Sequence, residues 1–135
     1  ESCTGGMVST AITDKAGSSA VFERGFVTYS NQSKIDCLGV SPETLKKHGA
    51  VSLQTAEEMA KGALDNSEAK ISIAVTGIAG PDGGTPQKPV GLVYIGYGIK
   101  GGIVQAKAFN FTNMSREEVR LHITKEAFKI LLSIL

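Results

Sequence analysis

The run Ile71-Ser72-Ile73-Ala74-Val75-Thr76 is the clearest buried strand in the chain, because apolar and β-branched residues dominate it and Gly77 ends it. Two further β-rich runs, 90–99 and 103–111, lie around the turn Lys100-Gly101-Gly102 and are expected to form an antiparallel hairpin. The three runs therefore predict a single sheet. Helices and strands alternate along the chain, which is typical of parallel strands, whereas a hairpin is antiparallel. We therefore expect a sheet with mixed strand directions.

Helical patterns alternate with these strands along the sequence. A short β-rich run at Gly25–Tyr29 precedes a helix that carries Lys34. Serine residues before apolar stripes indicate helix starts, and Ser115 with Glu118 forms a capping box. Alternation of this kind in 135 residues predicts an α/β layered fold in a single domain. Helices are expected after Gly6, after Ser30, from Pro42 to Lys47, after Ser52 and after Ser115.

Composition excludes several functional classes. Fourteen basic and thirteen acidic residues give a net charge of +1, so no broad field attracts nucleic acid or an anionic membrane. No apolar run approaches the roughly 20 residues that a membrane span needs, and we expect a cytoplasmic protein. Cys3 and Cys37 form no disulfide framework, and no cysteine or histidine spacing matches a zinc site. We therefore expect no metal and no cofactor.

The first six residues, Glu1-Ser2-Cys3-Thr4-Gly5-Gly6, place a hydroxyl and a thiol just before a helix. Unpaired N–H groups at a helix N-terminus favour an anion or a developing oxyanion, so a nucleophile is expected here. Ser2 is the first candidate. Cys3 is its rival, because a helix N-terminus also stabilises a thiolate, and Ser2 as a simple helix cap is the structural alternative.

The loop from Gly77 to Pro89 holds four of the sixteen glycines and three of the four prolines. A loop of this length in a compact domain is more often functional than accidental. It contains neither a P-loop nor a Gly-x-Gly-x-x-Gly motif, which argues against a P-loop NTPase and a dinucleotide-binding domain.

Five segments in order resemble the CinA C-terminal domain family: ESCTGG (1–6), GSSAVFERGFVTYSN (17–31), GAVS (49–52), TGIAGP (76–81) and KPVG (88–91). The family includes bacterial nicotinamide-nucleotide amidases, which hydrolyse nicotinamide mononucleotide to nicotinate mononucleotide and ammonia. The resemblance implies a three-layer α/β/α sandwich. Family members usually carry a helix and a strand before the first segment, so we expect the domain at 1–135 to lack both.

The resemblance also implies a set of site residues. Ser2 matches the catalytic serine of the family, and Tyr29 and Lys34 match its partners. Lys34 would take the proton of Ser2, and Tyr29 would relay or orient it. The residues expected to hold the oxyanion are Thr4, Gly5 and Gly6, and those expected to hold the phosphate and ribose are Thr76, Gly77, Ile78, Ala79, Gly80, Arg24 and Lys88.

Two functions remain open from the sequence. The first is a metal-independent amidohydrolase that acts on a small nucleotide. The second is a module that binds a nucleotide or a partner without turnover. Apolar helix faces and an exposed hairpin edge would also suit a homodimer.

Overall fold

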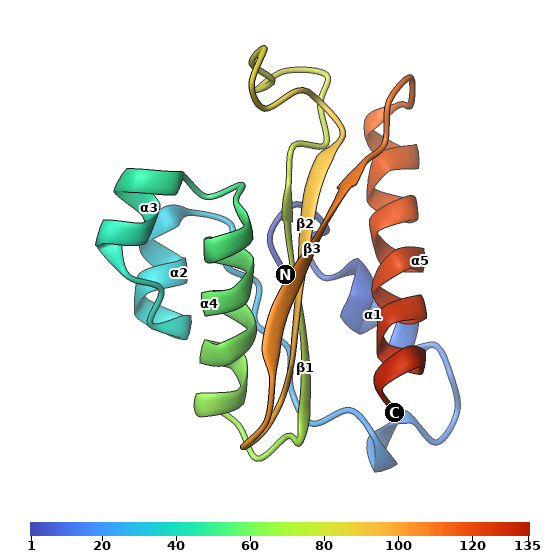
Figure 1. The fold of residues 1–135 in the computed structure, drawn as a ribbon. Coiled ribbons are helices and arrows are strands. Elements are labelled where there is room, and N and C mark those ends of the chain that lie inside the picture. The colour runs from blue at the N-terminus through green and yellow to red at the C-terminus, as the bar shows by residue number, and fades with distance from the viewer.

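The computed structural model covers residues 1–135 and alternates helices and strands as the sequence predicts (Figure 1). Every expected helix is present, and so are the buried strand and the hairpin. The elements in chain order are α1 (Met7–Thr13), the 3-10 turn η1 (Ser18–Ala20), α2 (Asn31–Leu38), α3 (Pro42–His48), α4 (Leu53–Asp65), β1 (Ile71–Gly77), β2 (Leu92–Ile99), β3 (Val104–Asn110) and α5 (Arg116–Ile134).

The sheet has the strand order β1-β2-β3, and both pairs of strands are antiparallel. In the register, Val75 of β1 lies opposite Ile95 of β2, and Ile95 lies opposite Lys107 of β3. The α/β class is confirmed, but the expectation of a mixed sheet is wrong for these three strands. No helix lies between successive strands, and antiparallel pairing is the usual result because the connection between parallel neighbours is usually a helix.

The β-rich run Gly25–Tyr29 does not form a strand of the sheet. This segment is extended, but it bonds to the start of the chain: Thr28 N–H donates to Glu1 O (2.8 Å), and the nitrogen of Glu1 donates to Phe26 O (2.7 Å). Ser2 N–H in turn donates to Val75 O of β1 (3.1 Å). Glu1 and Ser2 therefore lie between this segment and the edge of the sheet.

Helices cover both faces of the sheet and complete the three-layer sandwich (Figure 1). On one face, α1 and α5 pack over a core that includes Val75, Ile95 and Ile123. On the other face, α4 lies on the strands with α2 and α3 outside it, around Met59 and Ala74. The sheet therefore separates two apolar clusters.

Two glycines allow α4 to approach its neighbours closely. A Cβ at Gly62 of α4 would lie 1.9 Å from Leu38 O at the end of α2, and a Cβ at Gly96 of β2 would lie 2.1 Å from Ala56 O. Neither contact is sterically possible with a side chain. The position of α2 against α4 therefore depends on a residue without a Cβ.

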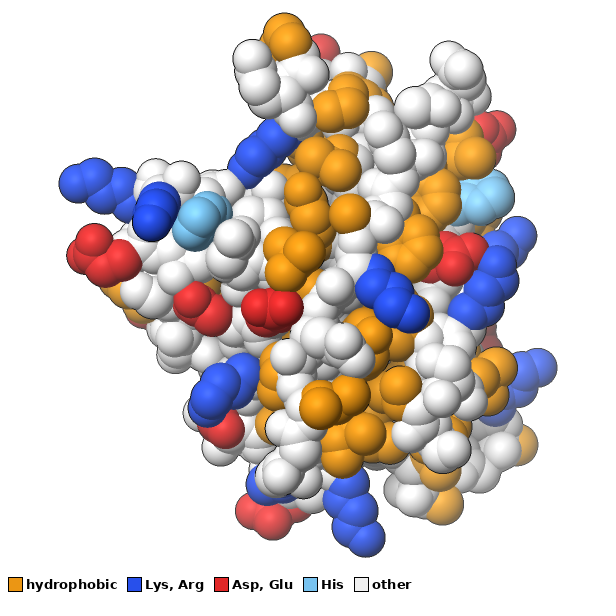
Figure 2. Space-filling view, in the orientation of Figure 1, with side chains coloured by type: hydrophobic (Ala, Val, Ile, Leu, Met, Phe, Trp, Pro, Cys, Tyr) orange, Lys and Arg blue, Asp and Glu red, His pale blue; other side chains and the backbone are white.

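The surface carries no dominant charge on the face in Figure 2. Hydrophobic side chains run along the middle of this face, and basic and acidic side chains are scattered beside them and at the edges. No helix combines the length and the apolar character that a membrane span requires.

Candidate active site

Ser2 and Lys34 meet beneath the surface. Ser2 lies in the turn before α1 and is 8% exposed, and Lys34 is fully buried on the inner side of α2. Lys34 Nζ donates a hydrogen bond to Ser2 Oγ over 3.1 Å. The structure thus brings together the predicted nucleophile and its predicted base, which are 32 residues apart in the chain.

The environment of Lys34 disfavours a charged side chain. Its Nζ donates to two backbone carbonyls, Thr28 O (2.7 Å) and Tyr29 O (3.3 Å), and to no carboxylate. Burial lowers the pKa of Lys34 below its ordinary value. A neutral lysine can accept a proton, so this position suits a general base.

Cys3 has the opposite character. Its side chain is buried in the apolar cluster under α5, and burial raises the pKa of the Cys3 thiol to about 11. The thiolate is therefore scarce at neutral pH, which weighs against Cys3 as the nucleophile. Ser2 is left as the better placed of the two candidates.

The turn after Ser2 does not use its N–H groups as the sequence suggested. Gly5 N–H donates to Ser2 O (3.0 Å), and Gly6 N–H donates to the Glu1 carboxylate (3.0 Å), so neither is free for an oxyanion. The N–H groups of Cys3 and Thr4 have no acceptor in the chain. These two amides are the better candidates for an oxyanion site.

Glu1 supplies the cap that α1 otherwise lacks. Its carboxylate accepts bonds from Thr4 Oγ1 (2.6 Å), Val8 N (3.1 Å) and Ser9 N (2.8 Å), besides Gly6 N. Burial alone would raise the pKa of Glu1, but these hydrogen bonds outweigh it and the pKa lies below its usual value. An anion of the protein itself therefore fills the N-terminus of α1.

Tyr29 reaches the site with its backbone and not with its hydroxyl. Its carbonyl accepts from Lys34, while the side chain is 62% exposed and its hydroxyl accepts from Arg116 Nη2 (3.2 Å). No hydrogen bond joins the hydroxyl to Ser2 or Lys34. The role of Tyr29 as a proton relay therefore gains no support from this geometry.

The first part of the loop after β1 is held by the protein itself. Thr76 is buried and its hydroxyl donates to Ala50 O (2.8 Å). Ile78 N–H donates to Leu92 O (3.0 Å), and Ala79 is buried in the core. None of these groups is available to a ligand, so the predicted contacts of Thr76 and Ile78 with substrate would need other atoms of these residues.

The glycines of the same loop are explained by packing. A Cβ at Gly77 would lie 2.7 Å from Val93 Cγ2, and a Cβ at Gly80 would lie 2.4 Å from Val90 Cγ1. Gly80 also has φ +80°, a left-handed conformation that favours glycine. These two glycines therefore let the chain after β1 lie close to β2 and the residues that precede it.

The two predicted basic contacts lie elsewhere. Arg24 pairs with Glu23 and donates to Asn66 O (2.9 Å) beside the end of α4, at the opposite end of the sheet from the loop after β1 (Figure 1). Lys88 Nζ donates to His48 O at the end of α3. Lys88 therefore ties the loop to the α3 layer, and Arg24 is not gathered with Ser2 and Lys34.

Two arginines that the sequence analysis did not select do reach this region. On α5, Arg116 Nη1 donates to Gly80 O (2.8 Å), and Arg120 donates to Cys3 O (3.0 Å) and Thr4 O (3.1 Å). Neither arginine pairs with a carboxylate. The available signal was their spacing, since residues four apart share one face of a helix.

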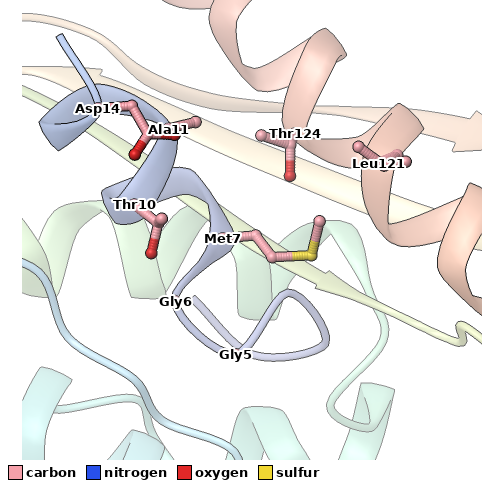
Figure 3. A pocket seen from close by; sticks show the side chains of 8 residues that line it. All are labelled: Gly5, Gly6, Met7, Thr10, Ala11, Asp14, Leu121 and Thr124. Carbon is pink, nitrogen blue, oxygen red and sulfur yellow. The ribbon is translucent and has the colours of Figure 1, made fainter.

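A groove of about 330 Å³ lies behind the Ser2 turn, between α1 and α5 (Figure 3). Met7 extends into it from α1 toward Leu121 and Thr124 of α5. Gly5 and Gly6 line this groove, but Ser2 and Lys34 do not. Nowhere do three or more His, Cys, Asp or Glu side chains gather in a way that could hold a metal ion.

Comparison with known proteins finds a family match along the whole chain. Residues 1–135 match the CinA C-terminal domain. The chain belongs to the CinA C-terminal domain family. The resemblance drawn from the five sequence segments is thereby confirmed.

Relatives in the CinA family carry two kinds of name. The nicotinamide-nucleotide amidohydrolase PncC of Enterobacter agglomerans is 54% identical over 121 residues, which are 90% of this chain and 73% of the relative. A CinA-like protein of Shewanella pealeana is 50% identical over 131 residues, or 97% of this chain. The chain spans only 31% of the length of that protein.

Solved structures of the CinA family share the fold. The competence/damage inducible protein CihA of Agrobacterium tumefaciens has a TM-score of 0.96 and 50% identity, covering 98% of this chain and 80% of its own. A CinA superfamily protein of Escherichia coli has a TM-score of 0.93 and 36% identity, covering 99% and 77%. These solved structures therefore confirm the expected α/β sandwich.

Proposed function

We propose that this CinA domain is an amidohydrolase that converts nicotinamide mononucleotide to nicotinate mononucleotide and ammonia, with Ser2 as nucleophile and Lys34 as base. The observation that carries the proposal is the buried contact of 3.1 Å between Lys34 Nζ and Ser2 Oγ, without a carboxylate nearby. The name of the Enterobacter agglomerans relative supports the choice of substrate. The reaction needs an activated nucleophile, an oxyanion site and a proton for the leaving group.

In the first half of the reaction, neutral Lys34 keeps its two N–H groups on Thr28 O and Tyr29 O. Its lone pair accepts the Ser2 O–H and takes that proton as Ser2 Oγ attacks the carboxamide carbon. The carbonyl π electrons move to oxygen, and the oxyanion accepts hydrogen bonds from the N–H groups of Cys3 and Thr4. Collapse of this intermediate breaks the C–N bond. Protonated Lys34 returns its proton to the leaving nitrogen, and ammonia departs from an acyl-serine ester.

In the second half, Lys34 takes a proton from water as the water oxygen attacks the ester. Collapse returns that proton to Ser2 Oγ and releases the carboxylic acid. Lys34 is charged in each intermediate, and the carbonyls of Thr28 and Tyr29 accept hydrogen bonds from its ammonium group. These two acceptors stabilise the intermediate.

Arg120 has a positioning role in this scheme. A peptide group is planar and trans, so its N–H points away from its own C=O. Because Arg120 Nε holds Cys3 O, the N–H of Thr4 is directed away from α5. Ser2 O and the Cys3 N–H belong to one peptide group, so the bond from Gly5 N–H to Ser2 O likewise fixes the direction of the Cys3 N–H. Both oxyanion donors are therefore fixed before substrate arrives.

The test is ammonia release from nicotinamide mononucleotide by the wild type and three variants. We expect Ser2→Ala and Lys34→Met to lose activity by about 10³-fold or more, because the first removes the nucleophile and the second removes the base that activates it. Cys3→Ala should stay within about tenfold of wild type, since its thiol only packs. A rate that survives in Ser2→Ala but is lost in Cys3→Ala would refute the mechanism.

A wild type that binds the nucleotide without releasing ammonia would refute the enzymatic proposal. Calorimetric titration with nicotinamide mononucleotide distinguishes that outcome from an inert preparation. Binding without turnover would favour a nucleotide-binding module instead.

A further inference from the structure

We propose that Arg116 and the hydroxyl of Tyr29 bind the phosphate of the nucleotide, and so distinguish nicotinamide mononucleotide from its dephosphorylated form. This inference rests on the proposed function. It replaces Arg24 and Lys88, whose side chains are committed to Glu23, Asn66 and His48.

Arg116 has donors to spare. A guanidinium carries five N–H donors, and Arg116 uses one on Gly80 O and one on the hydroxyl of Tyr29. The chain has three arginines: Arg24 is paired with Glu23, Arg120 is held by two carbonyls, and Arg116 has neither a carboxylate partner nor a buried side chain. An exposed guanidinium with free donors is suited to a phosphate.

Tyr29 adds a second donor at the same place. A phenol hydroxyl can accept and donate, and the Tyr29 hydroxyl accepts from Arg116 Nη2 (3.2 Å). Its own proton has no acceptor in the chain and the side chain is 62% exposed. The O–H group and the guanidinium can therefore donate to one anion together.

Tyr29 also separates the two parts of the proposed substrate site. Its backbone carbonyl lies 3.3 Å from Lys34 Nζ, and its hydroxyl contacts Arg116. The catalytic pair and the proposed phosphate site are thus separated by one tyrosine side chain. The carboxamide and phosphate of the nucleotide lie at opposite ends of the molecule, which requires such a separation.

The place of Arg116 on α5 also suits a bound anion. Arg116 is the first residue of α5, where the helix dipole disfavours a cation. Glu117 and Glu118 in the same turn interact favourably with the positive end of the helix dipole, but neither forms an ion pair with Arg116. A bound phosphate would interact favourably with both the guanidinium and this end of the helix.

The experiment compares nicotinamide mononucleotide with nicotinamide riboside, which lacks the phosphate. We expect Arg116→Gln to lower kcat/KM for the nucleotide by roughly 10- to 100-fold, mainly through KM, as loss of a charge-assisted bond predicts. Activity on the riboside should change less than about twofold. Tyr29→Phe should show a smaller loss with the same substrate preference.

The matched control is Lys125→Gln, which removes one positive charge from an exposed position farther along α5. It should leave both substrates unaffected. A purely structural role of Arg116 would lower the melting temperature and both activities together, and that result would overturn the proposal. Equal losses on the two substrates with unchanged melting would overturn it as well.

Failure of the proposed function would be seen separately, as a wild type that releases ammonia from neither substrate. The phosphate site is then tested by calorimetry with nicotinamide mononucleotide and with nicotinamide riboside. Weaker binding of only the phosphorylated ligand to Arg116→Gln would support the site. Equal affinity of wild type and variant for that ligand would refute it.

Discussion

Lys34 occupies an environment that opposes its own charge. The side chain is fully buried, its bonds go to Ser2 and to two carbonyls, and no carboxylate offsets a positive Nζ. Such a lysine costs folding stability whenever it is protonated. A site that needs a base near neutral pH gives a physical reason to retain this cost.

The cost predicts a pH dependence of stability. The folded-state pKa of Lys34 is lowered below its ordinary value of 10.5, so the folded state binds fewer protons than the unfolded state between the two values. The penalty is present in full below the folded pKa and disappears as the pH rises toward 10.5. The free energy of unfolding of wild type should therefore rise relative to Lys34→Met across this window.

Urea titrations of both proteins at a series of pH values between 6 and 10 measure this difference, and other titrating groups cancel because both proteins share them. A constant difference across the range would show that Lys34 titrates normally.

At the level of elements, close packing sets the position of α2, and hence of Lys34, against the rest of the fold. α2 ends where Leu38 O meets α4, at a point where a Cβ on Gly62 would lie only 1.9 Å away. Helix propensity alone would favour alanine at position 62 by about 1 kcal/mol. The tertiary contact opposes this preference.

We therefore expect Gly62→Ala to destabilise the protein by about 1–3 kcal/mol despite its better helix propensity, because the methyl group must push α2 from α4. Activity should fall as well, since Lys34 lies on α2. The control is Gly102→Ala, whose Cβ would meet only ordinary contacts of 3.5 Å or more. A gain in stability for Gly62→Ala in urea unfolding would show that α2 moves aside without cost.

For the whole molecule, the sheet divides the core into two apolar clusters. Ile123 of α5 belongs to one cluster and Met59 of α4 to the other, and both side chains are fully buried. The proposed catalytic pair depends on both layers, because Ser2 precedes α1 and Lys34 belongs to α2. A single cooperative fold is therefore required to join them.

Ile123→Ala and Met59→Ala should each lower the free energy of unfolding by about 2–5 kcal/mol, as loss of a large buried side chain predicts. Because the two residues share no cluster, the double variant should lose the sum of the two effects within about 0.5 kcal/mol. Denaturant unfolding of all four proteins provides the comparison. A strong departure from additivity would mean that the sheet transmits strain between its faces.

The helices and strands were largely predictable because their signals are local. Serine caps and apolar periodicity located α2 through α5, and the β-branched run located β1. The segment Gly25–Tyr29 has strand composition and is extended, yet it forms no strand of the sheet. Composition does not decide which extended segment pairs with a strand of the sheet, because pairing requires a strand edge whose backbone groups are free.

Helix caps, apolar periodicity and matching segments can be recognised along the chain, so the helices, the family and the candidate pair Ser2 and Lys34 could be predicted. The burial of Lys34 against Ser2, the Glu1 cap on α1 and the contact between Arg116 and Tyr29 became visible only in the folded protein. These contacts join residues distant in the chain. Their charge states and free donors depend on burial and on partners that no local pattern specifies.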